Sequence, residues 1–158
     1  MKLKFSALPT LDVQRIRSGG ADANGLNPEL AVSDGGGNPC RHCLQDIPAG
    51  KEMLVLAYRP FPELQPYAEV GPIFFCADDC ERHAEVESCP ELVLKRDQIL
   101  IKGYSSNNRI AYGTGKIVPT ESVDQEASRI LANPDVAYVH LRSATNNCYF
   151  ARIDRADD

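Results

Sequence analysis

Two short cysteine pairs constrain this chain more than any other feature of its sequence. A C-x-x-C pair contains Cys40 and Cys43, and a C-x-x-x-C pair contains Cys76 and Cys80. These spacings suit a metal ion held tetrahedrally by four thiolates. We therefore predict a structural Zn²⁺ site with Cys40, Cys43, Cys76 and Cys80 as its ligands. Such a site leaves no coordination position open for chemistry.

The N-terminus lacks the apolar run and small-residue cleavage site of a secretory signal, so we expect a cytoplasmic protein. Thiols stay reduced in that compartment, which favours metal binding or redox use of paired cysteines over disulfides. Two other interpretations remain open. The pairs could be reactive thiols, which requires an accessible, electropositive site, or buried cysteines that pack as small apolar residues.

Three residues near the pairs could replace one of the four ligands. His42 lies inside the first pair, His83 follows the second, and Cys89 is a further thiol nearby. Either histidine would give a site of three thiolates and one imidazole. Four thiolates on Zn²⁺ leave two negative charges, and we expect Arg41 or Arg82 to offset them together with backbone N–H groups.

The size and charge of the chain restrict the classes of protein to which it can belong. Its 158 residues suit one domain, 1–158, and its apolar stretches are shorter than the roughly 20 residues of a membrane-spanning helix. The formal net charge of −5 makes nucleic acid an improbable partner. We expect a protein or a small molecule as the partner instead.

In the N-terminal half, strands are predicted at 1–8, 51–58 and 71–75. The glycine-rich run 18–38 predicts a long loop that is either mobile or used for binding. Acidic residues after Cys76 favour a short helix that the second cysteine pair opens and that ends at about Val86. That helix would place Cys76 and Cys80 one turn apart and complete a zinc-binding subregion at 40–86.

The C-terminal part, 98–155, predicts a hairpin, a helix and a second hairpin. Strands at 98–104 and 109–118 flank one turn, and strands at 136–141 and 148–153 flank another at 145–147. Between them, Thr120 or Ser122 can cap an amphipathic helix that ends at Asn133. The fold class is therefore α+β, a mainly antiparallel sheet with a packing helix and a zinc-stapled N-terminal half.

Two further groups of residues could carry function. His140, Arg142, Asn146 and Cys148 gather around the second hairpin, and a thiol near a histidine is one route to a nucleophile. Strand alternation places His140 on the more exposed face, and Cys148 is expected to be buried. The second group comprises aromatic residues between prolines, which could line a pocket under the 18–38 loop for a small molecule or peptide: Tyr58, Phe61 and Tyr67.

Two resemblances add to these inferences. Residues 40–86 resemble treble-clef zinc fingers, above all over 74–82. Nearly the whole chain resembles a bacterial family of uncharacterised proteins, domain of unknown function 1203, through the segments 39–41, 67–74 and 139–149. That resemblance implies no activity. It also implies that the metal is an optional brace, since some members carry His at the position of Cys76 and others lack the second cysteine of the first pair.

Together these inferences predict a binding or interaction module with a structural zinc, and not an enzyme. The alternative is a thiol- or metal-dependent enzyme. An exposed, reactive thiol or a three-ligand metal with bound water would support that alternative.

Overall fold

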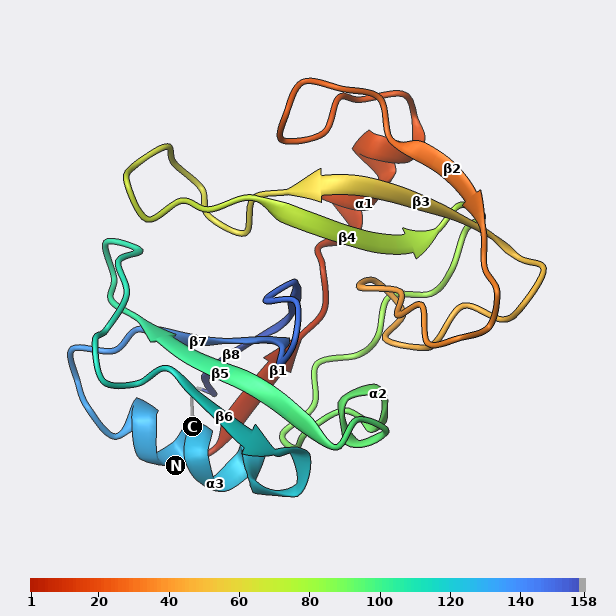
Figure 1. The fold of residues 1–158 in the computed structure, drawn as a ribbon. Helices are drawn as coiled ribbons and strands as arrows, with labels where there is room; N and C mark the ends of the chain where they lie inside the picture. Colours follow the sequence, from red (N-terminus) through yellow and green to blue (C-terminus); the bar gives the residue numbers. More distant parts are fainter. Residues whose placement is uncertain (157–158) are drawn as a thin grey trace.

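Antiparallel strands form two sheets in the computed structural model, which describes residues 1–156 (Figure 1). The large sheet has the order β1 (Leu3–Ser6), β8 (Tyr149–Arg155), β7 (Tyr138–Ser143), β5 (Gln98–Tyr104) and β6 (Lys116–Pro119). The small sheet has the order β2 (Glu29–Val32), β3 (Glu52–Tyr58) and β4 (Gly71–Cys76). The helices are α1 (Thr10–Arg17), α2 (Glu91–Leu94), the 3₁₀ turn η1 (Thr120–Ser122) and α3 (Val123–Leu131).

Helix α3 covers one face of the large sheet, where it packs on β1, β5, β7 and β8. The apolar side of this helix is buried as its sequence predicts, with Val123, Ala127, Ile130 and Leu131 in the core. Ser122 is the N-cap residue of α3, as one of the two predicted alternatives, but its side chain makes no capping hydrogen bond. The Thr120 hydroxyl donates to the Arg96 carbonyl and does not cap the helix. The packing helix itself confirms the predicted α+β class.

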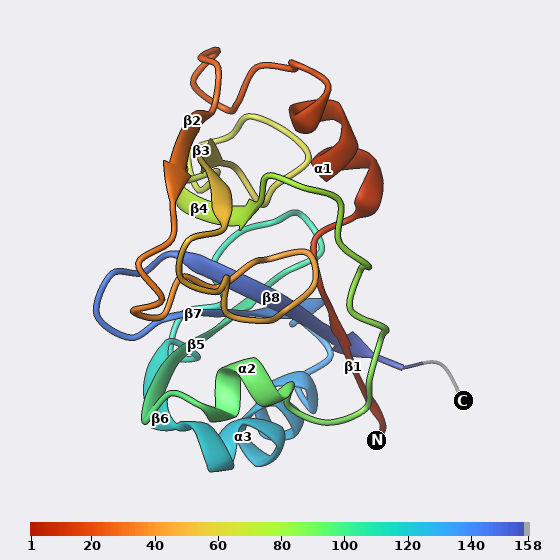
Figure 2. The ribbon, with the colours of Figure 1, turned by 90° about the vertical axis from the view of Figure 1, so that its right-hand side faces the viewer.

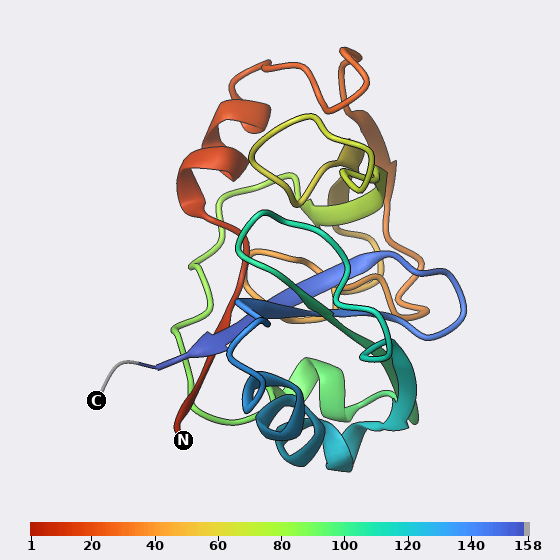
Figure 3. The ribbon, with the colours of Figure 1, turned by 90° about the vertical axis from the view of Figure 1, so that its left-hand side faces the viewer.

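The small sheet and α1 lie over the opposite face of the large sheet (Figures 2 and 3). Their apolar residues form a second core that includes Val13, Ile16, Ile73 and Phe75, together with Tyr149 of β8. The central strand β7 is consequently buried on both faces from Tyr138 to Arg142. The prediction that His140 is the more exposed residue is therefore wrong, since its side chain is only 1% exposed.

Both predicted C-terminal hairpins are present. Strands β7 and β8 enclose the turn at 145–147, and β5 pairs with β6. The strand predicted over 109–118 is shorter than expected, because only Lys116–Pro119 pairs continuously with β5. Ile110 makes a single bridge to Tyr104, and Gly113 adopts a φ of +84°, so the chain between them loops away from the sheet.

The N-terminal half differs from the prediction in three segments. Thr10–Arg17 is helical, and the expected loop 18–38 contains the edge strand β2. The expected helix over 78–86 is absent from that range, which the structure describes as an extended crossing between the sheets. Backbone hydrogen bonds hold the crossing in place, from His83 N to His42 O and from Phe5 N to Val86 O.

In residues 1–156, no helix combines the length and the apolar character that a membrane-spanning helix requires.

Candidate functional site

The first cysteine pair lies on a tight turn. Leu44 N donates to Cys40 O at 3.0 Å and Cys40 N donates to Gln45 O at 2.9 Å, which closes the turn. Leu44 takes a φ of +51°, a left-handed conformation that reverses the chain directly after Cys43. A parallel bridge between Cys40 and Phe74 places this turn beside the end of β4.

The second pair begins where β4 ends, with Cys76 as the last residue of the strand and Cys80 in the irregular segment after it. The four sulfurs of Cys40, Cys43, Cys76 and Cys80 lie within 4.8 Å of one another. Cys40 Sγ and Cys80 Sγ are 3.9 Å apart. Zn–S bonds of about 2.3 Å in a tetrahedron separate the sulfurs by about 3.8 Å. The Cys40–Cys80 separation is close to that value, and the cluster could therefore hold a metal ion.

The protonation of the cluster also favours a cation. Hydrogen bonds from Cys43 and Cys76 hold the pKa of the Cys40 thiol far below its usual range. The same contact with Cys40 raises the pKa of Cys43 to about 12 and raises the pKa of Cys76 further. The thiols of Cys40, Cys43 and Cys76 thus favour a single shared negative charge, because like charges at this distance repel. A bound metal would allow all four to ionise.

Arg17, in the last turn of α1, supplies a positive charge to this cluster. Its Nη2 lies 3.3 Å from Cys80 Sγ and 2.8 Å from Cys76 O, and its side chain is 11% exposed. Arg41 and Arg82, which the sequence suggested for this task, bond elsewhere: Arg41 to the Tyr149 and Pro39 carbonyls, and Arg82 to those of Ala7 and Leu8. The sequence did not point to Arg17 as the cation beside the cysteines. A helix predicted over 10–17 would have been needed to find it, because Arg17 lies in the last turn of that helix.

His42 contacts the cluster as a neighbour of Cys80. Its Nδ1 lies 3.1 Å from Cys80 Sγ and its Nε2 lies 3.0 Å from the Thr10 hydroxyl. Burial lowers the pKa of His42, so the ring is neutral. With the Thr10 hydroxyl donating to Nε2, the Nδ1–H can donate to the sulfur, a contact that orients a ligand.

His83 and Cys89 lie outside the group of candidate ligands found in residues 1–156. The His83 ring contacts the Ala84 carbonyl through Nδ1, at 2.6 Å. Cys89 is buried in the core of the large sheet, and its backbone N–H donates to Asp124. The four cysteines are therefore the group that the fold brings together.

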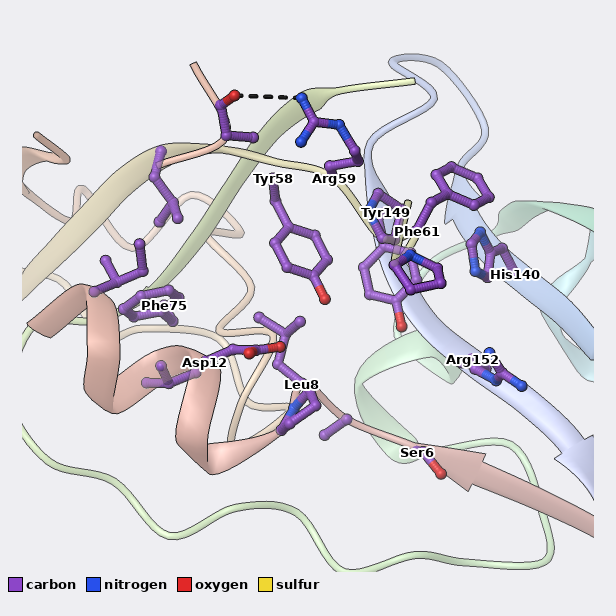
Figure 4. A pocket seen from close by; sticks show the side chains of 18 of the residues that line it. Ser6, Leu8, Asp12, Tyr58, Arg59, Phe61, Phe75, His140, Tyr149 and Arg152 are labelled. Carbon is purple, nitrogen blue, oxygen red and sulfur yellow. Dashed lines mark hydrogen bonds between the residues drawn. The ribbon is translucent and has the colours of Figure 1, made fainter. Parts of the chain in front are cut away.

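Next to the cysteine cluster, a cleft of about 870 Å³ lies between the large sheet, α1 and the small sheet (Figure 4). We call it the inter-sheet cleft. Tyr58 and Phe61 line it as the sequence suggests, and so do residues 21–23 of the glycine-rich segment. Tyr67 is absent from the lining residues, and its hydroxyl lies 3.0 Å from that of Tyr112 instead.

The residues around the second hairpin divide between two places. Arg142 Nη2 lies 3.2 Å from His140 Nδ1, and the His140 ring lines the inter-sheet cleft. Cys148 and Asn146 line a separate pocket of about 150 Å³ that His140 does not reach. Cys148 is half-buried, not buried as predicted. The thiol and the imidazole therefore do not form a nucleophilic pair.

Comparisons with known proteins bear on these features through one family. A family model described as "Protein of unknown function (DUF1203)" matches residues 37–155, which include all four clustered cysteines. No curated protein and no solved structure matches the chain.

Proposed function

Since the chain belongs to the DUF1203 family, whose function is unknown, we propose from its site geometry that it is a binding module with a structural zinc. In this proposal, Cys40, Cys43, Cys76 and Cys80 bind the ion and the inter-sheet cleft binds a ligand. The observation that carries the proposal is the convergence of four sulfurs within 4.8 Å beside a cleft of about 870 Å³.

The metal site supports a structural role because its four sulfurs would fill a tetrahedral shell. With no open position, the ion has no place for substrate or an activated water. The ion would instead fix the position of the 40–43 turn against the end of β4. Both segments belong to the same apolar core as α1 and β3.

Helix α1 connects the two features physically. Arg17 in its last turn contacts the cysteine cluster, whereas Asp12, Val13 and Ile16 line the inter-sheet cleft. A metal that fixes one end of α1 would therefore hold a wall of the cleft in place. Clefts of roughly 300–1,000 Å³ are typical of small-molecule sites, which supports a small ligand over a folded protein partner.

Elemental analysis of the purified protein by plasma mass spectrometry tests the metal assignment. We expect about one zinc per chain, lost in the Cys76→Ser, Cys80→Ser double variant with reduced stability. Cys148→Ser is the matched control, because it removes a half-buried thiol outside the cluster and should retain the zinc. Protein purified without chelator and free of zinc would contradict the assignment.

The same preparation distinguishes the alternative, a thiol- or metal-dependent enzyme. A structural site protects its thiolates, so iodoacetamide should modify the zinc-loaded cysteines slowly. Rapid modification of one cysteine in the zinc-loaded protein would favour the enzyme and count against the binding module.

A further inference from the structure

A row of polar side chains crosses the face of the large sheet that borders the inter-sheet cleft. In the strand register, Lys102 of β5 pairs with His140 of β7, His140 pairs with Arg152 of β8, and Arg152 pairs with Ser6 of β1. Directly paired residues share a face of a sheet. His140, Arg152 and Ser6 also line the cleft, so this row forms part of its floor.

Arg142 fixes which nitrogen of His140 carries a proton. Its Nη2 lies 3.2 Å from His140 Nδ1, and a guanidinium can only donate hydrogen bonds. Nδ1 is therefore the acceptor, and the proton of the neutral ring lies on Nε2. The salt bridge from Arg142 to Glu69, at 2.9 Å, holds the guanidinium in this position. His140 is thus a pre-oriented donor with a free Nε2–H.

The surroundings keep His140 neutral. Burial is the main cause that lowers its pKa well below the usual value, and the charges of Arg142, Arg152 and Lys102 add to it. The nearby carboxylates are already paired, Glu69 with Lys102 and Arg142, and Asp154 with Arg152. The potential around the ring is therefore positive, which disfavours a second proton and favours an anion.

Two tyrosine hydroxyls in the lining have no hydrogen-bond partner within residues 1–156. They belong to Tyr58 and Tyr149, and Figure 4 shows Tyr149 beside His140. The His140 and Tyr149 rings are 5.0 Å apart at their centroids, in an edge-to-face arrangement. In the described residues, neither hydroxyl is among the buried polar atoms that lack a partner, so both oxygens face solvent in the cleft and are available to a ligand.

The net charge of the residues that line the cleft has the opposite sign to the net charge of the whole chain. Six basic side chains but only three acidic ones line the inter-sheet cleft, a surplus of three positive charges, although the chain has a formal net charge of −5. The basic residues are Lys4, Arg15, Arg59, Arg82, Arg152 and Arg155, and the acidic ones are Asp12, Asp22 and Asp154. Figure 4 shows Asp12 at the far end of the cleft from His140.

We propose that the inter-sheet cleft binds a small organic anion, with its acidic group at His140 Nε2, Arg152 and the Tyr149 hydroxyl. This inference rests on the proposed binding function and adds the chemical class of the ligand. An apolar part of the ligand would lie along the wall formed by Leu8, Val13, Phe61 and Phe75. The acidic group would be a carboxylate, sulfonate or phosphate, which share the ability to accept several charge-assisted hydrogen bonds.

Two fluorescent probes with the same ring system test the charge requirement. 8-Anilinonaphthalene-1-sulfonate carries one sulfonate, and N-phenyl-1-naphthylamine lacks it. We expect the zinc-loaded wild-type protein to bind the sulfonate probe at least about tenfold more tightly, because hydrogen bonds to a charged group contribute that much affinity. Benzoate or phenyl phosphate should displace the sulfonate probe, and benzyl alcohol should not.

Variants then locate the anionic group. Tyr149→Phe and His140→Phe each keep an aromatic ring and remove a donor, so each should weaken binding of the sulfonate probe several-fold and leave binding of the neutral probe unchanged. Tyr138→Phe is the matched control, because the Tyr138 hydroxyl bonds to Asn108 and is absent from the cleft lining. Near-UV circular dichroism of each variant verifies folding, and Tyr149→Phe removes no hydrogen bond present in residues 1–156.

The outcomes separate this inference from the proposed function. Suppose that both probes bind equally, that Phe61→Ala weakens the binding of both, and that His140→Phe and Tyr149→Phe change neither. That result would overturn the anionic ligand and leave the binding module standing. Binding of neither probe to the zinc-loaded protein would overturn both. A sulfonate preference that His140→Phe and Tyr149→Phe share with wild type would place the anion elsewhere and overturn the assigned position.

Discussion

His140 is a buried side chain that bears on stability as well as on the proposed anion site. Four aromatic rings surround it, those of Phe61, Tyr104, Tyr138 and Tyr149, with centroids 4.6–5.4 Å away. An imidazole in such a position is desolvated and must stay neutral. The unfolded chain has no such restriction, so the folded and unfolded states bind protons differently.

We predict that this difference makes stability depend on pH. An unfolded histidine gains a proton below about pH 6.5, whereas the lowered pKa of His140 keeps it unprotonated in the fold. Stability from this group is therefore complete above pH 7.5 and falls as the solution is acidified. In urea unfolding, wild type should lose up to about 2 kcal/mol more than His140→Phe between pH 7.5 and pH 5.

The difference between wild type and His140→Phe isolates the contribution of His140. All other titrating groups, including the clustered cysteines, contribute equally to the pH dependence of both unfolding free energies and cancel. Arg142 keeps its partners Glu69 and the Asn147 carbonyl in the variant, so the fold should tolerate the change. Parallel pH profiles for wild type and His140→Phe would show that His140 titrates normally and would contradict the prediction.

Individual residues were predictable from sequence where the information is local. The proximity of the four cysteines was predictable from their spacing, because each pair is separated by only two or three residues, a spacing typical of metal ligands. His140 was placed on the wrong face because alternation along β7 indicates which residues share a face, but not that the small sheet covers the second face. Its partner Arg152 comes from register with β8, which the hairpin turn determines only approximately.

At the scale of elements, the segments 10–17, 29–32 and 78–86 were the least predictable. In α1, Leu11 is 80% exposed and only Val13 and Ile16 are buried, so its apolar pattern is too short to predict a helix. Strand β2 exposes Leu30 and Val32 at the edge of the small sheet. The crossing at 78–86 has helix-favouring charges, but its hydrogen bonds to Phe5 and His42 favour the extended form. Tertiary contacts override propensity in all three.

Helix α1 nevertheless carries the residue that we expect to tune metal affinity. Arg17→Gln removes the charge beside Cys80 and two hydrogen bonds to the Cys76 carbonyl. Loss of such a contact to a metal ligand usually weakens binding at least about tenfold. Competition with a chromogenic zinc chelator should therefore show weaker zinc binding in this variant than in wild type.

Arg15→Gln is the control from the same helix, because the Arg15 side chain bonds to the Ala21 carbonyl and not to the cluster. It should bind zinc as wild type does. Equal affinities in all three proteins would show that Arg17 contributes nothing to the charge balance of the site.

On the scale of the whole molecule, the apolar core is divided. One cluster joins the large sheet to α2 and α3, and includes Phe5, Ile101 and Val139. A second joins the small sheet to α1 and contains Cys40, with Cys43, Cys76 and Cys80 packed against it. A third, smaller cluster contains Phe61, Tyr104 and Tyr138. A metal bound by the four cysteines would therefore stabilise one layer directly, whereas the layer of hairpins and α3 has a core of its own.

This division predicts that loss of metal acts on one layer first. A ligand present at 100 times its dissociation constant stabilises the bound form by about 2.7 kcal/mol, so chelation should speed local opening around the site about 100-fold or more. Hydrogen exchange should then accelerate in α1, β3 and β4 but change little in β5, β7 and α3. Helix α1 forms a wall of the cleft and contacts the cysteine cluster through Arg17. Binding of the sulfonate probe should therefore weaken as α1 loses its protection against hydrogen exchange. Uniform acceleration in both layers would instead show that the metal stabilises a single cooperative unit.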